Sequence, residues 1–357
     1  MATESVTAMP ISWPPAWPRA LDEVVGESPL HGNYRAIPED FQVEEVLGFA
    51  PEGEGEHLWL WVEKRDLTTL ELVKRLARIC GVAVRDIGYS GMKDRVAITR
   101  QWLSVHLPGR EAPVDLSEQL ADVPVTLLEQ VRHPRKLKRG VHRANRFRLR
   151  LTGEVVRDPG VERRWQWLCD HGVPNYFGPQ RFGPGGRNLI KARTVLERGW
   201  RKRDDREGML LSTARSYLFN MLLARRITEG NWAAALPGEV LILDGTASQF
   251  VADTIDDELQ GRLECLDVHP SGVLWGEGRL VSRAQAAACE NALCTEEPIL
   301  CEGLQRAGVR MSRRPLRVRL HAPLLEHDET ALTLSFELPR GAFATSVVRE
   351  LMMHSSL

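Results

Sequence analysis

The sequence predicts an α+β protein made of two domains. The chain has 357 residues, which is more than one typical domain length. Alternating apolar runs such as "HLWLWVEK" (His57–Lys64) are typical of half-buried strands, and they stand beside segments with helical apolar spacing. From about residue 231 to 310 the composition changes, and short β-like runs alternate with an Ala-rich helical run. This change is consistent with a second domain.

The composition is that of an ordinary globular protein. Apolar residues make up 43% of the chain, charged residues 27%, and the formal net charge is -1, so global charge does not predict a nucleic-acid partner. There is no run of about 18 apolar residues and no secretory signal pattern, so we expect a cytoplasmic protein without a membrane span. The six cysteines are scattered without zinc-site spacing, so we expect reduced thiols and no metal.

The first segments are an extended arm and a well-marked helix. Residues 1–33 are rich in Pro and small residues, which predicts an arm. Thr68 and Glu71 form a capping box, and the apolar spacing that follows predicts a helix over 69–80. Gly81 is a natural end for this helix, because glycine readily adopts the left-handed conformation.

The stretch "GYSGMKDRVAITRQW" places Asp94 in a turn between two predicted strands, at 82–90 and 96–107. An Asp beside Lys93 in a turn is most often a solvated surface pair. The alternative is a nucleophilic or basic carboxylate kept ionised by a cation. Neighbours in a strand point to opposite faces, so the partner cation can come from a distant part of the chain.

Further elements follow from the same signals. Asp158 and Pro159 are expected to start a helix that ends at Gly172, and Ser212 is expected to cap a helix through 214–227. The remaining expected elements are strands at 239–245, 271–278, 316–323 and 331–339, and helices at 283–293 and 344–353.

Two stretches suggest contacts with RNA. Residues 173–189, "VPNYFGPQRFGPGGRNL", combine aromatic rings, an Asn and four glycines. This loop is either a glycine-rich turn over core aromatics or a base-binding loop, in which a ring stacks on a base and an amide reads its edge. Residues 132–151 hold nine Lys or Arg and no acidic residue, which is either a solvated face or a phosphate-binding stripe. The candidate phosphate contacts are Arg135, Lys136, Lys138, Arg139, Arg143 and Arg146.

Two more aromatic residues stand at candidate site positions, although each of them taken alone favours core packing. Phe41 precedes an alternating strand, and Phe343 lies in a turn before the last helix. No Walker loop, dinucleotide fingerprint, zinc-protease motif or nucleophile elbow occurs, so we expect no cofactor. A single carboxylate with aromatics, an Asn and a basic stripe suits a cofactor-free reaction on an RNA base.

The motifs resemble the TruD family of tRNA pseudouridine synthases. The matching stretches are "PEDFQVEE", "GEGEHLWL", "GMKDRVAITRQW", "VPNYFGPQRFGPGGRNL", "ARSYLFN" and "GAFATSVVRE", in the family's order from about residue 32 to the end. The resemblance implies isomerisation of uridine 13 in the D arm of tRNA, with Asp94 as the nucleophile. It implies that Phe41, Asn175, Phe177 and Phe343 surround the target uridine, and that Arg35, with Lys93, supports the ion pair of the aspartate. Many members have Lys where this chain has Arg35, which changes the geometry of the cation.

The resemblance also implies a discontinuous catalytic domain, 34–200 and 317–357, with a mixed and largely antiparallel sheet. An α/β insertion domain over 201–316 would form an RNA-sized cleft with it, and we expect a monomer. The Pro-rich start is longer and the end shorter than the family pattern, and Ala144 stands where a Gly is common. Two other functions stay open, an RNA-binding module without catalysis and a base-excising hydrolase. The sequence does not choose among attack on C1′, addition to C6 or a glycal route.

Overall fold

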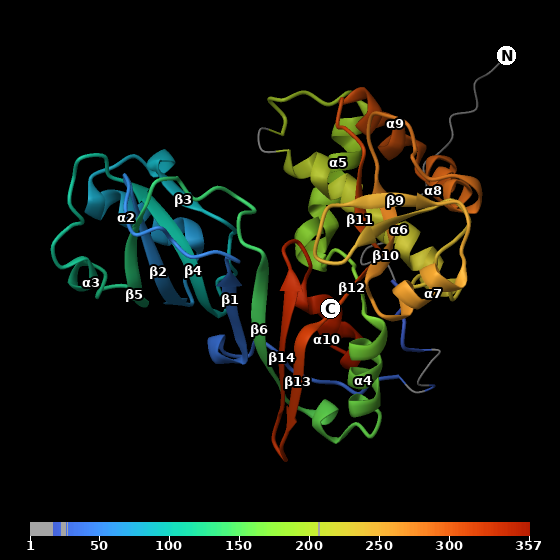
Figure 1. Cartoon of the computed structure of the whole chain (residues 1–357), viewed down its shortest axis with the longest axis horizontal. Helices are drawn as coiled ribbons and strands as arrows, with labels where there is room; N and C mark the ends of the chain where they lie inside the picture. Colours follow the sequence, from blue (N-terminus) through green and yellow to red (C-terminus); the bar gives the residue numbers. More distant parts are fainter. Residues whose placement is uncertain (1–16, 23–25, 27, 206–207) are drawn as a thin grey trace.

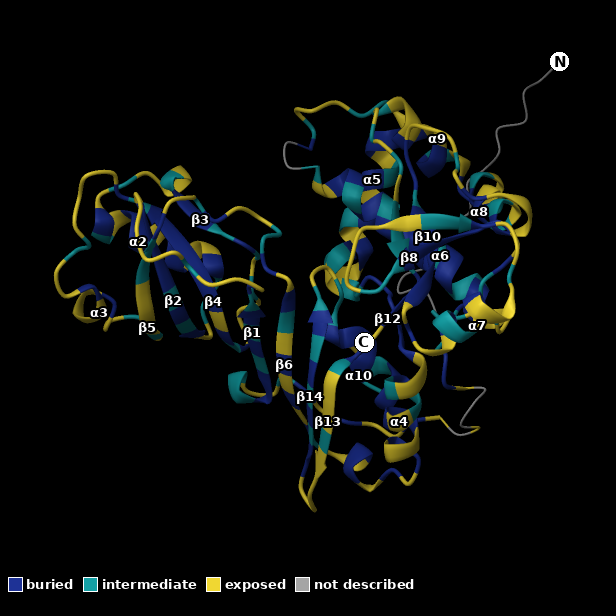
Figure 2. Cartoon of the chain, in the orientation of Figure 1, coloured by how far each residue is buried: buried dark blue, intermediate teal, exposed yellow. Residues whose placement is uncertain are grey.

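The computed structural model describes residues 17–22, 26, 28–205 and 208–357. Within them, one large and one smaller sheet organise the molecule, together with a short two-stranded pair. The large sheet runs through the left and central parts of the view, and the smaller one lies with its helices in the upper right lobe (Figure 1). Buried residues gather on the central strands and on the packed faces of the helices, whereas the loops and several edge strands carry many exposed residues (Figure 2). The predicted α+β class is confirmed.

The large sheet has eight strands in the order β13-β14-β6-β1-β4-β2-β5, with β3 paired to β4. Its strands are β1 (Phe41–Val46), β2 (His57–Arg65), β3 (Ile87–Tyr89), β4 (Ile98–His106), β5 (Val125–His133), β6 (Ala144–Leu151), β13 (His321–His327) and β14 (Leu332–Pro339). The β1–β4 pair is parallel, and the other pairs are antiparallel. The sheet is therefore mixed and largely antiparallel, as predicted.

Helices pack on this sheet at two places, and each place has its own hydrophobic core. The helix α2 (Thr69–Cys80) packs on β2 and β4 near the short α3 (Leu116–Gln119), and α4 (Val161–His171) and α10 (Ala344–Leu351) pack on β6 and β14. The α2 bounds confirm the predicted helix over 69–80, because Thr68 accepts a hydrogen bond from the Glu71 amide and Gly81 adopts φ 61°. Short 3-10 turns are η1 (Pro38–Asp40), η2 (Val84–Asp86), η3 (Glu154–Arg157), η4 (Pro179–Phe182) and η5 (Pro184–Gly186).

The smaller sheet has the order β11-β10-β8-β9 and a third core. Its strands are β8 (Glu239–Leu243), β9 (Gln249–Ala252), β10 (Val268–Leu274) and β11 (Ser312–Pro315). Its helices are α5 (Arg187–Glu197), α6 (Met209–Thr228), α7 (Asp257–Glu264), α8 (Ala284–Glu296) and α9 (Pro298–Arg306). The two-stranded pair of β7 (Val173–Pro174) and β12 (Arg317–Val318) joins the lobes. The predicted domain boundary at residue 201 falls between α5 and α6, and these two helices share one core. The boundary therefore stays a prediction.

Two helix starts differ from the sequence prediction. Ser212 does not cap a helix, because α6 already begins at Met209. The Asp205 carboxylate accepts hydrogen bonds from the amides of Leu210 and Leu211, at 2.9 and 3.1 Å, and so caps the first turn from four residues upstream of that start. The other helix, α4, begins at Val161 rather than directly after Asp158 and Pro159.

The described part of the N-terminal arm packs on the last helix. Residues 1–16 of the predicted arm lie outside the described residues. Leu21 is buried, and the Glu350 carboxylate on α10 accepts hydrogen bonds from the amides of Ala20 and Leu21, at 3.0 and 3.3 Å. Trp17 stacks on Tyr176 with ring centroids 6.1 Å apart. Within the described chain, none of the helices has the length and apolarity needed to cross a membrane.

Candidate active site

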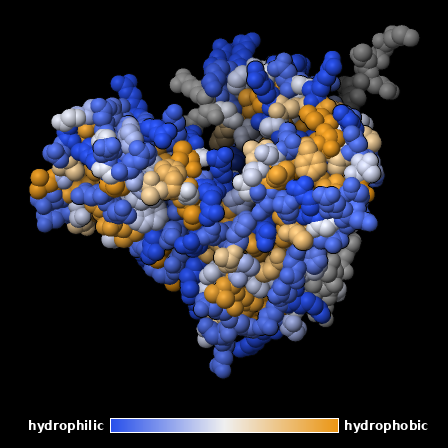
Figure 3. Space-filling model, viewed as in Figure 1, coloured by the Kyte–Doolittle hydropathy of each residue, from blue (hydrophilic) through white to orange (hydrophobic). Residues whose placement is uncertain are grey.

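A cavity of about 390 Å³ gathers five of the predicted site residues, namely Arg35, Phe41, Lys93, Asp94 and Phe343. The residues come from the turn before β4 (Asp94), the segment before β1 (Arg35), the start of β1 (Phe41) and the turn before α10 (Phe343). A fifth segment is η4, which lies in the lobe of the smaller sheet and contributes Arg181. The surface between the left and upper right lobes is hollowed and has hydrophilic residues along its rim (Figure 3). Asp94 is the one acidic side chain among the described residues that line the cavity.

Arg35 is the ion partner of Asp94. Its guanidinium forms an ion pair with Oδ2 of Asp94, and 15% of the Arg35 side chain is exposed against 50% for Asp94. The backbone of Arg35 has φ 59°, a left-handed conformation that costs free energy for a residue with a Cβ. The guanidinium also lies over the ring of Phe41, 3.7 Å from its centroid. Phe41 therefore orients the cation that holds the carboxylate.

Lys64 is fully buried and fixes the backbone of the Asp94 turn by hydrogen bonds. Its Nζ donates hydrogen bonds to the backbone carbonyls of Leu67 and Asp94, the latter at 3.0 Å. The ammonium has no carboxylate partner among the described residues. Burial lowers the pKa of Lys64 to about 8, although the negative charge of Asp94 opposes this change. Lys64 was not among the predicted site residues, and its only signal in the sequence is a lysine within an apolar strand.

Lys93, predicted to support the ion pair of Asp94, is itself paired with another carboxylate. Its Nζ forms a buried ion pair with Glu45 at 2.6 Å. His142 lies beside this pair and also lines the cavity. Burial, reinforced by the positive charges of Lys93 and Arg340, lowers the pKa of His142 to about 4, so the imidazole is neutral at pH 7.

Asn175 and Phe177 lie behind the cavity wall rather than on it. The side chain of Asn175 donates to the carbonyl of Pro315 at 2.8 Å, and its Oδ1 accepts from Arg314. The Arg314 guanidinium covers the ring of Phe177 at 4.0 Å from its centroid. In this arrangement neither residue is free to contact a base. Phe343 does line the cavity, and its ring lies 5.9 Å from that of Phe177.

Asn145 is an amide that lines the cavity itself and was not predicted as a site residue. Its Nδ2 lies 3.4 Å from Nε2 of His142. Its buried Oδ1 has no hydrogen-bond partner within the described part of the chain. A buried acceptor without a donor is costly, so a ligand that brings an N–H group would be favoured here.

The basic stripe is largely neutralised on the sheet. Its arginines alternate along β6 and face solvent, as predicted, but carboxylates on neighbouring strands pair with them. Arg146 contacts Glu44 on β1 at 3.1 Å and Glu337 on β14 at 2.7 Å, and Arg143 contacts Glu337 at 3.3 Å. The preceding loop is less paired. Arg135 lies 3.8 Å from Glu52, Lys136 and Arg139 bind the Arg85 carbonyl and the Tyr89 hydroxyl, and Lys138 is exposed.

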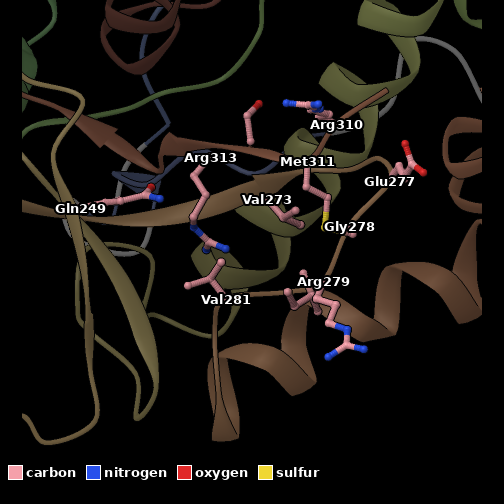
Figure 4. A pocket seen from close by; sticks show the side chains of 11 residues that line it. Gln249, Val273, Glu277, Gly278, Arg279, Val281, Arg310, Met311 and Arg313 are labelled. Carbon is pink, nitrogen blue, oxygen red and sulfur yellow. The ribbon is translucent and has the colours of Figure 1, made fainter. Parts of the chain in front are cut away.

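A second pocket, of about 560 Å³, lies in the smaller lobe and holds none of the predicted residues among its described lining. Arg310 and Arg279 lie on opposite sides of it (Figure 4). Arg313 is already paired with the buried Glu290. Its cations therefore do not converge on one ligand position, and the cavity around Asp94 is the stronger candidate.

Known proteins resemble this chain over nearly its whole length. The model of the family "tRNA pseudouridine synthase D (TruD)" matches residues 24–202 and 203–351. The chain is 59% identical to the tRNA pseudouridine synthase D of Chromohalobacter salexigens over 346 residues, which are 97% of this chain and 98% of that protein. It is 47% identical to the enzyme of that name from Pseudomonas putida, over 94% of each chain.

The fold has a solved counterpart. A crystal structure of a putative tRNA pseudouridine synthase D from Methanosarcina mazei superposes with a TM-score of 0.68 at 21% identity, covering 91% of this chain and 94% of that one. This similarity supports the fold, whereas the sequence matches carry the family assignment. The chain belongs to the TruD family of tRNA pseudouridine synthases.

Proposed function

We propose that this protein isomerises uridine 13 in the D arm of tRNA to pseudouridine, in the cytoplasm and as a monomer, with Asp94 as the nucleophile. The observation that carries the proposal is the cavity in which Asp94, paired with Arg35, is the one acidic group among the described lining residues. We take 34–200 and 317–357 as the catalytic domain and 201–316 as the insertion domain that faces it. In this division η4 and α5 belong to the catalytic domain by sequence but pack in the lobe of the smaller sheet.

The residues fit the chemistry of this isomerisation. The N1–C1′ bond of uridine breaks, the uracil turns, and a C5–C1′ bond forms, so there is no redox change and no net hydrolysis. The reaction needs a carboxylate at the sugar or base, and Asp94 offers one that is paired with the Arg35 guanidinium. Whether Asp94 attacks C1′, adds to C6 or removes the 2′ proton, the same carboxylate serves.

The target base has to leave its helical stem, and the cavity offers it contacts in return. Base flipping costs a few kcal/mol of unstacking, and stacking on an aromatic ring returns roughly 1–3 kcal/mol. Phe343 is the ring we assign to this role, because Arg314 covers the ring of Phe177. Asn145 is the amide we assign to the uracil edge, because its Oδ1 can accept from the N3–H group.

The test is tritium release from C5 of labelled uridine in bulk tRNA, with wild type beside Asp94→Asn. We expect release by the wild type alone, while both proteins bind tRNA, and pseudouridine mapping should place the product at position 13. Turnover near wild type by Asp94→Asn would contradict the role of Asp94. Free uracil instead of pseudouridine would indicate a base-excising hydrolase, and tRNA binding without any product would indicate a binding module.

A further inference from the structure

Arg181 is a half-buried cation on the cavity wall that faces the Asp94 lobe. It lies on η4, and η4 packs against α6 of the second lobe. Its guanidinium offers several N–H donors, and the hydrogen bond it makes within the described chain is one to the Ser212 hydroxyl at 3.2 Å. No carboxylate of the described residues forms an ion pair with it.

The charges around the cavity are therefore unevenly distributed. On the Asp94 side, Arg35 is neutralised by Asp94 and Lys93 by Glu45. On the opposite side, Arg181 has no such partner among the described residues. Arg314 behind it donates to neutral acceptors on Asn175 and Gly341 and lies over the ring of Phe177. Burial lowers the pKa of Arg181, which indicates that its positive charge is poorly compensated in the free protein. An anion at this wall would compensate that charge.

A flipped-out nucleotide carries such an anion with it. When its sugar and base reach Asp94, the phosphates that join the nucleotide to its neighbours come to the cavity mouth. Guanidinium and phosphate form strong, often bidentate, charge-assisted hydrogen bonds. We propose that Arg181 binds a phosphate flanking the target nucleotide, so that the nucleotide is held from the lobe opposite Asp94. This inference rests on the proposed function.

The experiment is a cycle that pairs a protein variant with a modified RNA. The substrates are tRNAs in which the phosphate on the 5′ or the 3′ side of the target uridine is a neutral methylphosphonate, each compared with RNA carrying the same sugars and an ordinary phosphate. Wild type should lose about 10- to 100-fold in kcat/KM when the contacted phosphate is neutralised, as for a hydrogen bond to a charged group. Arg181→Met should show a similar loss on ordinary RNA and less than about a twofold further loss on the methylphosphonate.

Two further variants make the result specific. Arg198→Met removes an exposed arginine at the end of α5, away from the cavity lining, and should respond to both RNAs as the wild type does. Arg181→Lys keeps the positive charge but not the planar guanidinium with its paired donors. On ordinary RNA it should lose part of the wild-type kcat/KM, and on the methylphosphonate RNA this difference from wild type should disappear. It serves in the same cycle if Arg181→Met does not fold.

The possible results distinguish a failure of the Arg181 contact from a failure of the proposed function. One outcome is that wild type forms pseudouridine, but replacing either phosphate lowers kcat/KM of the Arg181 variants by the same factor as that of wild type. In that case the proposed phosphate contact is wrong and the proposed function stands. If wild type forms no pseudouridine in any RNA, both fall together.

Discussion

The buried ammonium of Lys64 gives a prediction whose size follows from the structure. In the unfolded chain its pKa is 10.5, and in the folded protein burial lowers the pKa to about 8. Between these pH values the unfolded chain holds a proton that the folded protein has lost, so the free energy of unfolding rises with pH. The cost of the buried charge is present in full below pH 8 and amounts to about 3 kcal/mol. Between pH 7 and pH 10 the wild type should regain about 2.5 kcal/mol of it.

Lys64→Met removes this titration and leaves the other groups in place. We would measure the free energy of unfolding by urea denaturation at pH 7, 8, 9 and 10, for wild type, Lys64→Met and the exposed control Lys74→Met. The difference between wild type and Lys64→Met should change by about 2.5 kcal/mol over this range, whereas the Lys74→Met difference should stay flat. The change with pH is informative even though the variant also loses two hydrogen bonds, because that loss does not depend on pH. Parallel curves for wild type and Lys64→Met would refute the reasoning.

Three other predictions concern the surroundings of the site. Lys93→Met leaves the Glu45 carboxylate buried without its cation and should cost about 3–5 kcal/mol in urea denaturation, most of it recovered in Lys93→Met/Glu45→Leu; an unchanged midpoint would contradict this. His142 has a pKa of about 4 in the folded protein and 6.5 in the unfolded chain, so the free energy of unfolding should fall as the pH drops from 6.5 to 4. In an acid titration, His142→Gln should lose up to about 3 kcal/mol less stability over this range than the wild type does. Thr68→Ala should cost about 1 kcal/mol, because the first turn of α2 loses its cap, and a smaller loss in Thr68→Ser would support this reading.

The parts of the molecule that local signals determine could be predicted from the sequence. The helix over 69–80 has a capping box, an apolar stripe and a terminal glycine within fourteen residues, and the structure has these bounds. The turn that carries Asp94 was also expected, because strand patterns stand on both sides of it.

The parts that depend on distant residues could not be predicted in this way. Arg314 stands far along the chain from Phe177, so its position over the ring has no local signal. The arginines of β6 read as free charge in the sequence, but Glu44 and Glu337 belong to strands that become neighbours only in the folded sheet. The start of α6 was misplaced for a related reason, since its capping group, Asp205, lies outside the window in which a cap is usually sought.

The pairing of β6 with β14 has a consequence for the order of events during synthesis. β6 lies between β1 and β14, and β14 is made only after the whole of the smaller lobe. While the chain is being translated, N-terminal parts fold first, so β6 spends that time as an open sheet edge. Open edges invite pairing with other chains, and charged side chains discourage it. The arginines of β6 would therefore protect the nascent chain from aggregation until β14 and its carboxylate arrive to close the sheet.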